Sequence, residues 1–170
     1  GSNSNLLSGE LATHLTGRYI DFTLYPLSFK EILNFKPNIY LVEDIAKVQK
    51  QLDKYLKESG FPEFRNFGSK IVEIIYQDII NKDCLDRHDI KNKKTFKELS
   101  KYLTSNFSSE FTYSKLSNIF NVKDVHTVKN YVDYLKESFV IIAIDRFSPK
   151  LKQQVISPKK VYVVDHGICN

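Results

Sequence analysis

Residues 111–135, FTYSKLSNIFNVKDVHTVKNYVDYL, contain two short helical patterns separated by the turn-like sequence NVKD. Apolar side chains recur at helical spacing in both patterns, so each helix is expected to bury one face. These side chains are Leu116, Ile119 and Phe120 in the first helix and Val128, Val132 and Leu135 in the second, with Tyr131 at the margin. Asp124 stands where the second helix needs an N-cap, and the stretch therefore predicts a helix-turn-helix.

The second of these helices carries a polar stripe opposite its apolar face. His126, Lys129, Asn130 and Asp133 follow one another at i, i+3, i+4 and i+7. In helix-turn-helix proteins the first residues of the second helix enter the major groove, where Asn can pair with adenine and Lys with guanine or phosphate. We expect His126, Thr127, Lys129 and Asn130 to contact duplex DNA, whereas Asp133 would repel phosphates.

Two segments after the helix-turn-helix have the composition of β-strands, FVIIAID (139–145) and KKVYVVD (159–165). Thr95 and Glu98 are in capping-box relation ahead of another helical pattern, so a winged-helix domain is predicted from about Thr95 to Asp165. Between the strands, residues 146–160 (RFSPKLKQQVISPKK) contain five cations and no acid. We expect this segment to be the wing, a hairpin in which Arg146, Lys150 and Lys152 contact phosphates.

The residues before this domain indicate helices for the most part. Leu6, Leu7, Leu11 and Leu15 suggest a short helix, residues 19–25 (YIDFTLY) a strand, and residues 28–34 a helix with a Ser28/Glu31 capping box. Residues 43–59 have one apolar helical face, and residues 70–81 are apolar on nearly all sides, which predicts a buried central helix. The predicted fold class is α+β, mostly α, with a helical lid-like segment followed by a winged helix-turn-helix.

Composition sets further bounds. The chain has 170 residues, 42% of them hydrophobic, and a net charge of +5. This charge favours nucleic acid or an acidic partner only mildly. Nothing approaches the roughly 18 consecutive apolar residues of a membrane span, and there is no signal-peptide pattern, so a cytoplasmic protein without membrane contact is expected.

Other catalytic or metal-binding chemistry has little support in the sequence. Cys84 and Cys169 have no ligand-spaced histidine partners, so we expect free thiols and no metal site. No G-x-x-x-x-G-K-[ST] motif is present, and we therefore predict no enzymatic activity and no cofactor for this chain itself. Asp78, Asp83 and Asp86, close to Arg87 and His88, are interpreted as solvated helix ends or ion pairs rather than a nuclease site.

Several motifs, taken in order, resemble one family. These are GSNS, LTGR, YPLSFKEIL, GFPE, DIINKD, TVKNYVDYLKESFVI and KKVYVVDHG. They are similar to successive signatures of AAA-type P-loop ATPases of archaea and bacteria that carry a winged helix and a nuclease-like C-terminal domain of unknown function. Two departures are mild: Ser59 stands where the family usually has a glycine, and Lys82 where it usually has an arginine. A further departure is His166, which replaces a small residue in the terminal VDHG.

The resemblance implies a domain organisation. Residues 1–34 would be a remnant of the ATPase core, 35–92 a helical lid-like region, 93–165 the winged helix, and 166–170 the start of a further domain. In the full-length parent, which would use ATP and Mg²⁺, Asn3 would face the γ-phosphate and Arg18 would be a phosphate sensor or arginine finger.

The favoured function is a DNA-binding and regulatory segment of such an ATPase. The alternative from another class is a protein-interaction or oligomerisation module without DNA contact. In that case the 19–25 strand or a helix would be exchanged between copies, since an unpaired strand edge is a template for pairing. A free-standing transcription regulator would require an effector pocket that the sequence does not indicate.

Overall fold

The computed structural model describes residues 22–38 and 40–169, which form two compact units. One unit consists of residues 77–163, and the other of residues 22–76 together with 164–169. The predicted helix at residues 4–17, and with it Asn3 and Arg18, lies outside the described residues. In the described part of the chain, no helix combines the length and the apolar composition that a membrane span requires.

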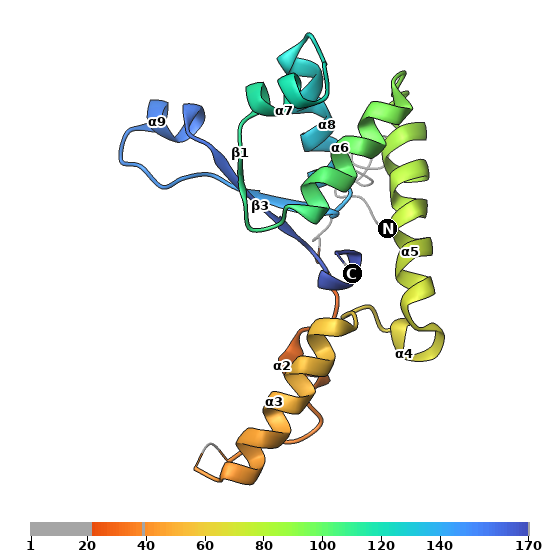
Figure 1. Ribbon diagram of the computed structural model, residues 1–170, viewed down its shortest axis with the longest axis vertical. Helices are drawn as coiled ribbons and strands as arrows, with labels where there is room; N and C mark the ends of the chain where they lie inside the picture. Colours follow the sequence, from red (N-terminus) through yellow and green to blue (C-terminus); the bar gives the residue numbers. More distant parts are fainter. Residues whose placement is uncertain (1–21, 39, 170) are drawn as a thin grey trace. The chain divides into compact units, whose positions relative to one another are not determined.

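The unit of residues 77–163 combines helices with a small antiparallel sheet (Figure 1). Its helices are α6 (Lys93–Ser105), α7 (Tyr113–Ile119), α8 (Val125–Glu137) and α9 (Leu151–Ile156). Its strands are β1 (Glu110–Phe111), β2 (Ile141–Ile144) and β3 (Lys159–Val163), arranged β1-β3-β2. The register pairs Phe111 with Lys159 and Ile142 with Tyr162.

The two predicted helices of residues 111–135 and the Asp124 N-cap are confirmed. Both predicted strands are present but shorter than the patterns FVIIAID and KKVYVVD. The third strand, β1, was not predicted, because two residues are too few to show a strand period. The segment predicted to be a simple hairpin is different in the structure, since it contains helix α9.

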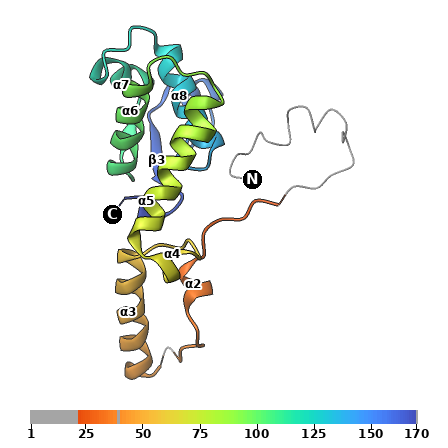
Figure 2. The same ribbon diagram turned by 90° about the vertical axis from the view of Figure 1, so that its right-hand side faces the viewer.

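The core of this unit lies between the helices α6, α7 and α8 and the inner face of the sheet (Figure 2). Its fully buried side chains are Phe96, Leu99, Leu103, Leu116, Val128, Val132, Leu135, Val140, Ile141 and Val161. Burying each such side chain contributes on the order of 1.5–3 kcal/mol. Two expectations were wrong at the edge of this core: Tyr131 is only 7% exposed and packs against Phe96, whereas Ile119 is 44% exposed.

The start of α6 also differs from the prediction. The helix begins at Lys93, two residues before Thr95, and its N-cap is Asn92. The Asn92 side chain accepts a hydrogen bond from the backbone N–H of Thr95 at 3.2 Å. Lys93 and Lys94 therefore belong to the first turn of the helix, where the amide oxygen of Asn92 satisfies one of the free N–H groups.

The helix expected at residues 70–81 has a different extent and environment. Helix α5 (Ser69–Asp78) begins in the unit of residues 22–76 and continues as a π-helix, η2 (Ile79–Asp86), in the other unit. Only one side is buried, through Val72, Ile80, Cys84 and Leu85, while Ile74 is 47% exposed. The prediction of a helix buried on all sides is therefore wrong for the described chain.

The second unit is built from short helices and one long helix. They are α2 (Phe29–Ile32), α3 (Val42–Lys57), α4 (Phe64–Phe67), most of α5, and the 3₁₀ turn η3 (His166–Ile168). The Ser28/Glu31 capping box is confirmed, with the Ser28 N–H donating to Glu31 at 2.8 Å. Residues 22–25 are not a strand, which corrects the described part of the predicted YIDFTLY strand.

The C-terminal residues occupy an unexpected place in this organisation. Residues 164–169 belong to the same compact unit as residues 22–76, and η3 packs against α3. The sequence placed residues 166–170 at the start of a further domain and placed a boundary near residue 93. The compact units divide the described chain after Tyr76 and after Val163, and η3 contacts α3. The predicted domain assignments, with a further domain from residue 166, stay predictions.

Candidate nucleic-acid interface and the motif junction

The N-terminus of α8 is held by Asp124. Its carboxylate accepts hydrogen bonds from the backbone N–H groups of His126 and Thr127, both at 3.0 Å, and from the Thr127 hydroxyl at 2.9 Å. The Thr127 hydroxyl bond is the main reason that the pKa of Asp124 is lowered, followed by the His126 backbone bond. The cap fixes the direction in which the first turn of α8 presents its side chains.

The predicted recognition residues lie together on α8. His126, Lys129 and Asn130 are exposed, as the stripe required. Thr127 is half-buried, and its hydroxyl proton is donated to Asp124, so only its acceptor capacity is left for a ligand. Asp133, one turn further on, is paired with Lys136 at 3.0 Å. The positive and neutral groups are thus at the N-terminal end of the stripe and the acid at the C-terminal end.

The second group of predicted residues lies in the segment between β2 and β3. Arg146, Lys150 and Lys152 are exposed, and none of the ion pairs within the described part of the chain uses them. Lys150 is the N-cap residue of α9. Lys159, at the end of the same cationic segment, is paired with Asp145.

A hollow of about 290 Å³ lies between α9 and the first residues of α7 and α8. Phe111, Val125, Val155 and Ile156 provide its apolar lining, and Tyr113 is at its edge with Lys159 6.0 Å from the ring centre. Burial, with smaller contributions from the carboxylates of Asp133 and Asp145, raises the pKa of Tyr113 to about 12. The Tyr113 hydroxyl therefore stays protonated at neutral pH.

Sequence reasoning missed a second constellation, in which three of the quoted motifs meet. Asp165, only 2% exposed, accepts hydrogen bonds from the Ser59 hydroxyl (2.7 Å) and from the N–H groups of Gly60 and Gly167 (both 2.8 Å). The Gly60 carbonyl in turn accepts from the Leu27 N–H at 2.7 Å. The motifs YPLSF, GFPE and VDHG thus meet in one junction. In the sequence, Asp165 directly after the apolar residues Val163 and Val164 was the feature that could have indicated a buried, hydrogen-bonded carboxylate.

The rest of this junction is tightly packed. A Cβ atom at Gly60 would stand 2.4 Å from the Leu27 carbonyl oxygen, and one at Gly167 would stand 2.6 Å from the Ser59 Cβ. Tyr55 donates to the Leu27 carbonyl at 3.0 Å and contacts the His166 ring edge-on at 4.4 Å. Burial, and then the carboxylates of Asp165 and Glu31, raise the pKa of Tyr55. Each polar group named here has a hydrogen-bond partner within the chain, so the arrangement stabilises the fold and leaves none of these groups for a ligand.

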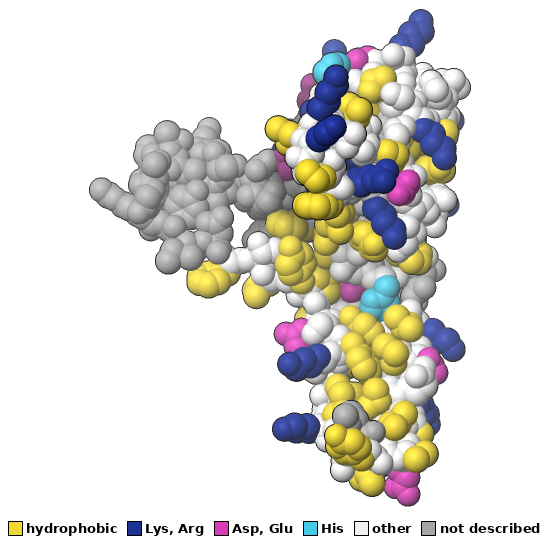
Figure 3. Space-filling view, turned by 90° about the vertical axis from the view of Figure 1, so that its left-hand side faces the viewer, with side chains coloured by type: hydrophobic (Ala, Val, Ile, Leu, Met, Phe, Trp, Pro, Cys, Tyr) yellow, Lys and Arg dark blue, Asp and Glu magenta, His cyan; other side chains and the backbone are white. Residues whose placement is uncertain are grey.

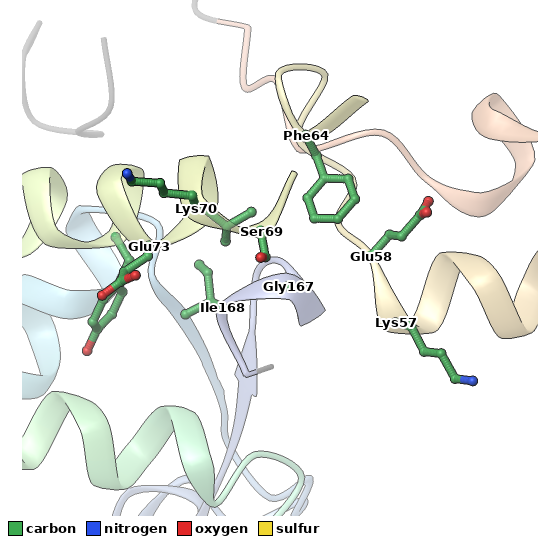
Figure 4. Close-up of a pocket in the computed structure, with 10 residues that line it drawn as sticks. Lys57, Glu58, Phe64, Ser69, Lys70, Glu73, Gly167 and Ile168 are labelled. Carbon is green, nitrogen blue, oxygen red and sulfur yellow. The ribbon is translucent and has the colours of Figure 1, made fainter. Parts of the chain in front are cut away.

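A hollow of about 420 Å³ lies beside this junction, at the start of α5 (Figure 4). Phe64 and Ile168 face it, and Ser69 and Glu73 lie at its α5 side. The ammonium groups of Lys57 and Lys70 point away from its centre, so cations do not converge on a ligand there.

The acidic cluster of DIINKDCLDRH is occupied by ion pairs. Asp78 pairs with Lys82 at 2.9 Å, Asp83 with Arg87 at 3.8 Å and Asp86 with Lys93 at 3.9 Å. No group of three or more His, Cys, Asp or Glu residues that could hold a metal occurs in residues 22–38 and 40–169.

Two side chains of this region contact α8 or its C-cap: Cys84, which is buried, and His88, which is half-buried. Burial raises the pKa of the Cys84 thiol to about 11, and its sulfur lies 3.2 Å from the Ser138 hydroxyl oxygen. His88 stacks on Tyr134 at 3.7 Å, and burial is the main cause of its lowered pKa. Both residues fix η2 to the end of α8. Cys169, the other free cysteine, also has a pKa raised by burial to about 11.

These observations define a mostly helical α+β chain with a small three-stranded antiparallel sheet. The chain belongs to the family described as domain of unknown function DUF8612, whose model matches residues 49–170. Residues 1–33 match an AAA domain model, which relates the N-terminal part of the chain to AAA-type ATPases. The expected relationship to AAA-type ATPases is thus supported for the N-terminal residues 1–33.

Two relatives are uncharacterized proteins. One, from Methanocaldococcus jannaschii, is 35% identical over 97% of this chain and 40% of its own length. The other, from Haemophilus influenzae, is 33% identical over 99% of this chain and 43% of its own length. The chain thus spans less than half the length of these relatives. No solved structure matches the chain significantly.

Proposed function

We propose that this chain is the DNA-binding and regulatory segment of an AAA-type ATP-binding protein, in which the ATP state of the core governs contact with DNA. The observation that carries the proposal is the exposed group of His126, Lys129 and Asn130 on the first turns of α8. These residue types, at the N-terminal end of a helix that follows a short helix and turn, suit the major groove.

The element order supports a winged-helix assignment for residues 93–163. In this order α6, β1, α7 and α8 precede β2 and β3, and the segment between β2 and β3 takes the place of the wing. In this proposal Asn130 and Lys129 read base edges, while Arg146, Lys150 and Lys152 contact phosphates. Both groups belong to the unit of residues 77–163, and the proposal requires that they contact the same duplex.

The regulatory half of the proposal concerns the parent protein. Asn3 and Arg18 remain candidates for sensing the nucleotide, and their support is the AAA match of residues 1–33 together with the motifs around them. ATP and Mg²⁺ would supply phosphoryl-transfer chemistry in the whole protein. ATP turnover there would reposition the proposed winged helix on DNA.

Binding to duplex DNA, titrated with salt, tests the DNA half. Affinity should fall steeply as salt rises, because phosphate contacts release counterions. Lys129→Glu should weaken binding by about tenfold or more. Lys50→Glu, an exposed change on α3, is the matched control and should have little effect.

Two results would contradict this function. Absence of binding at low salt excludes duplex DNA as the ligand. Equal losses for Lys129→Glu and Lys50→Glu would indicate attraction by diffuse surface charge instead of an α8 interface.

The second candidate function is a protein-interaction or oligomerisation module without DNA contact. It is favoured by the exposed apolar side chains of Phe147, Leu151 and Val155, which phosphate contacts do not explain. Light scattering separates the two functions, since a stable oligomer that ignores DNA supports this candidate.

A further inference from the structure

The segment around α9 exposes large apolar side chains. Phe147, Leu151, Val155 and Ile156, here called the α9 patch, are between 67% and 87% exposed. Figure 3, which faces the side where α9 lies in Figure 1, shows hydrophobic side chains at the surface bordered by lysine and arginine. Grouped apolar exposure of this kind in a short segment marks an interaction site more often than an ordinary surface.

Hydrogen bonds within the segment explain why its apolar side chains face outward. The Ser148 hydroxyl donates to Gln153 at 2.9 Å, and the Gln154 side chain donates to the Ser148 carbonyl at 2.6 Å. The Lys150 N–H also donates to the Ser148 hydroxyl oxygen at 3.2 Å. The polar side chains of Ser148, Gln153 and Gln154 thus bond within the segment, while its large apolar side chains face solvent. An ordinary surface helix shows the opposite arrangement, with its apolar face buried.

The patch continues into the hollow of about 290 Å³ described above. Val155 and Ile156 belong to the patch and also line the hollow, opposite Phe111 and Val125. A partner side chain can therefore insert between α9 and the starts of α7 and α8 while its neighbours cover Leu151 and Phe147. Such an insertion would remove apolar surface from water on both partners.

Charge indicates the chemistry of that partner. Arg146, Lys150 and Lys152 border the patch, and no ion pair within the described residues neutralises them. A second copy placed patch to patch would bring these cations together, which is unfavourable. Duplex DNA would satisfy the cations but would leave the apolar side chains without an apolar partner.

We propose that the α9 patch docks a protein segment that is both acidic and apolar, with large apolar side chains on one face and carboxylates beside them. The apolar side chains cover the patch and enter the hollow, and the carboxylates pair with Arg146, Lys150 and Lys152. The α8 contacts proposed for DNA take no part in this docking. Arg146, Lys150 and Lys152 are, however, the cations that the proposed function places on phosphates, so the docked segment and duplex DNA would compete for them.

Three labelled synthetic peptides of equal length test the proposal by fluorescence anisotropy with the full chain. The first has Leu and Phe on one helical face and Glu elsewhere, the second has Lys in place of Glu, and the third has Ser in place of Leu and Phe. The first should bind at least about tenfold more tightly than the other two, because it alone matches both charge and apolarity. Lys152→Glu should weaken its binding and reduce its salt dependence.

Val155→Asp should lower affinity for the first peptide by about tenfold or more. Ile74→Asp, at an exposed apolar position of α5, is the matched control and should leave affinity unchanged. Circular dichroism checks that both variants fold. If Val155→Asp is unfolded, Leu151→Gln takes its place in the measurement. Val155→Ser, which adds no charge beside the cations, should also weaken binding of the first peptide and should leave duplex DNA binding within about twofold of the parent, which separates this proposal from the DNA interface.

The proposal is overturned if the three peptides bind alike, or if none binds at about 1 mM, the weak end of specific association. It is also overturned if Val155→Asp, folded, binds the first peptide as the parent does. A loss of duplex affinity in Val155→Ser that parallels its loss of peptide affinity would assign the patch to nucleic acid and would equally overturn a protein partner.

Discussion

At the scale of single residues, Asp165 is a buried carboxylate at the meeting point of three segments of the chain. It is almost fully buried and accepts from one hydroxyl and two backbone N–H groups. A buried carboxylate is tolerated only when its oxygens are hydrogen-bonded. The bonds from Ser59 and Gly60 join residues about one hundred positions apart, so Asp165 couples the C-terminal turn to the loop after α3.

Asp165→Asn should destabilise the chain by about 1.5–3 kcal/mol, the range for a hydrogen bond to a charged group. One oxygen would become an NH₂ group facing a backbone N–H, so at least one of the three bonds is lost. Urea unfolding followed by circular dichroism measures the change. Asp53→Asn, at an exposed carboxylate on α3, is the control and should stay close to the parent. Similar midpoints for both variants would refute a stabilising role for Asp165.

At the scale of elements, α8 shows how local chemistry defines a helix. Its N-cap is a single carboxylate with three hydrogen bonds, and its buried face repeats Val128, Val132 and Leu135 at helical spacing. Both features are local in sequence, and for that reason the helix could be predicted with its cap. Its exposed stripe is a consequence of the same period.

Asp124→Ala should lower the thermal midpoint at pH 7 and have a smaller effect in acid. The pKa of Asp124 is lowered in the folded chain, so its stabilisation is complete above the unfolded pKa of about 3.9. It is lost as pH falls through the folded pKa, because the protonated group is a weaker acceptor. Thermal melts at pH 7 and near pH 3 measure the difference in thermal midpoint between the parent and the variant, here called the gap. A gap that is the same at both pH values would show that hydrogen bonding to the carboxylate is not its cause.

At the scale of the whole molecule, the chain is divided in a way that does not follow its sequence order. The described residues of one unit, 77–163, are continuous, whereas the described residues of the other unit come from both sides of them. In the second unit the Leu27 N–H donates to the Gly60 carbonyl, and the Gly60 N–H donates to the carboxylate of Asp165. The hydrogen bond of the Gly60 N–H is therefore lost when Asp165 is removed.

A chain ending at Val163 should therefore lose protection locally. Hydrogen exchange of the Gly60 amide should be about tenfold faster or more, since it loses a charged acceptor worth about 1.5–3 kcal/mol. Amides of Val128 and Val132, in α8, should keep their protection, because no residue of their unit is removed. Equal acceleration in α8 would contradict the independence of the two units.

Prediction from sequence succeeded where the determining contacts are close along the chain. The Ser28/Glu31 capping box, α7, α8 and the Asp124 cap were predicted because each depends on residues within a few turns. It failed at α5 and η2, where nearly continuous apolar residues suggested burial on all sides. The predicted site residues on α8 lie together, but their contact with DNA stays a prediction.

The sequence by itself determined helices α2, α3, α7 and α8, the two main strands and the polar stripe of α8, because periodicity and caps act within one element. Only the tertiary structure decided that β1 pairs with β3, that α9 turns its apolar side chains outward, and that Asp165 joins Ser59 and Gly60. These features rest on contacts between residues far apart in sequence, or on which face of an element other elements leave uncovered. No local pattern encodes them, since the same residues in another arrangement would find other partners.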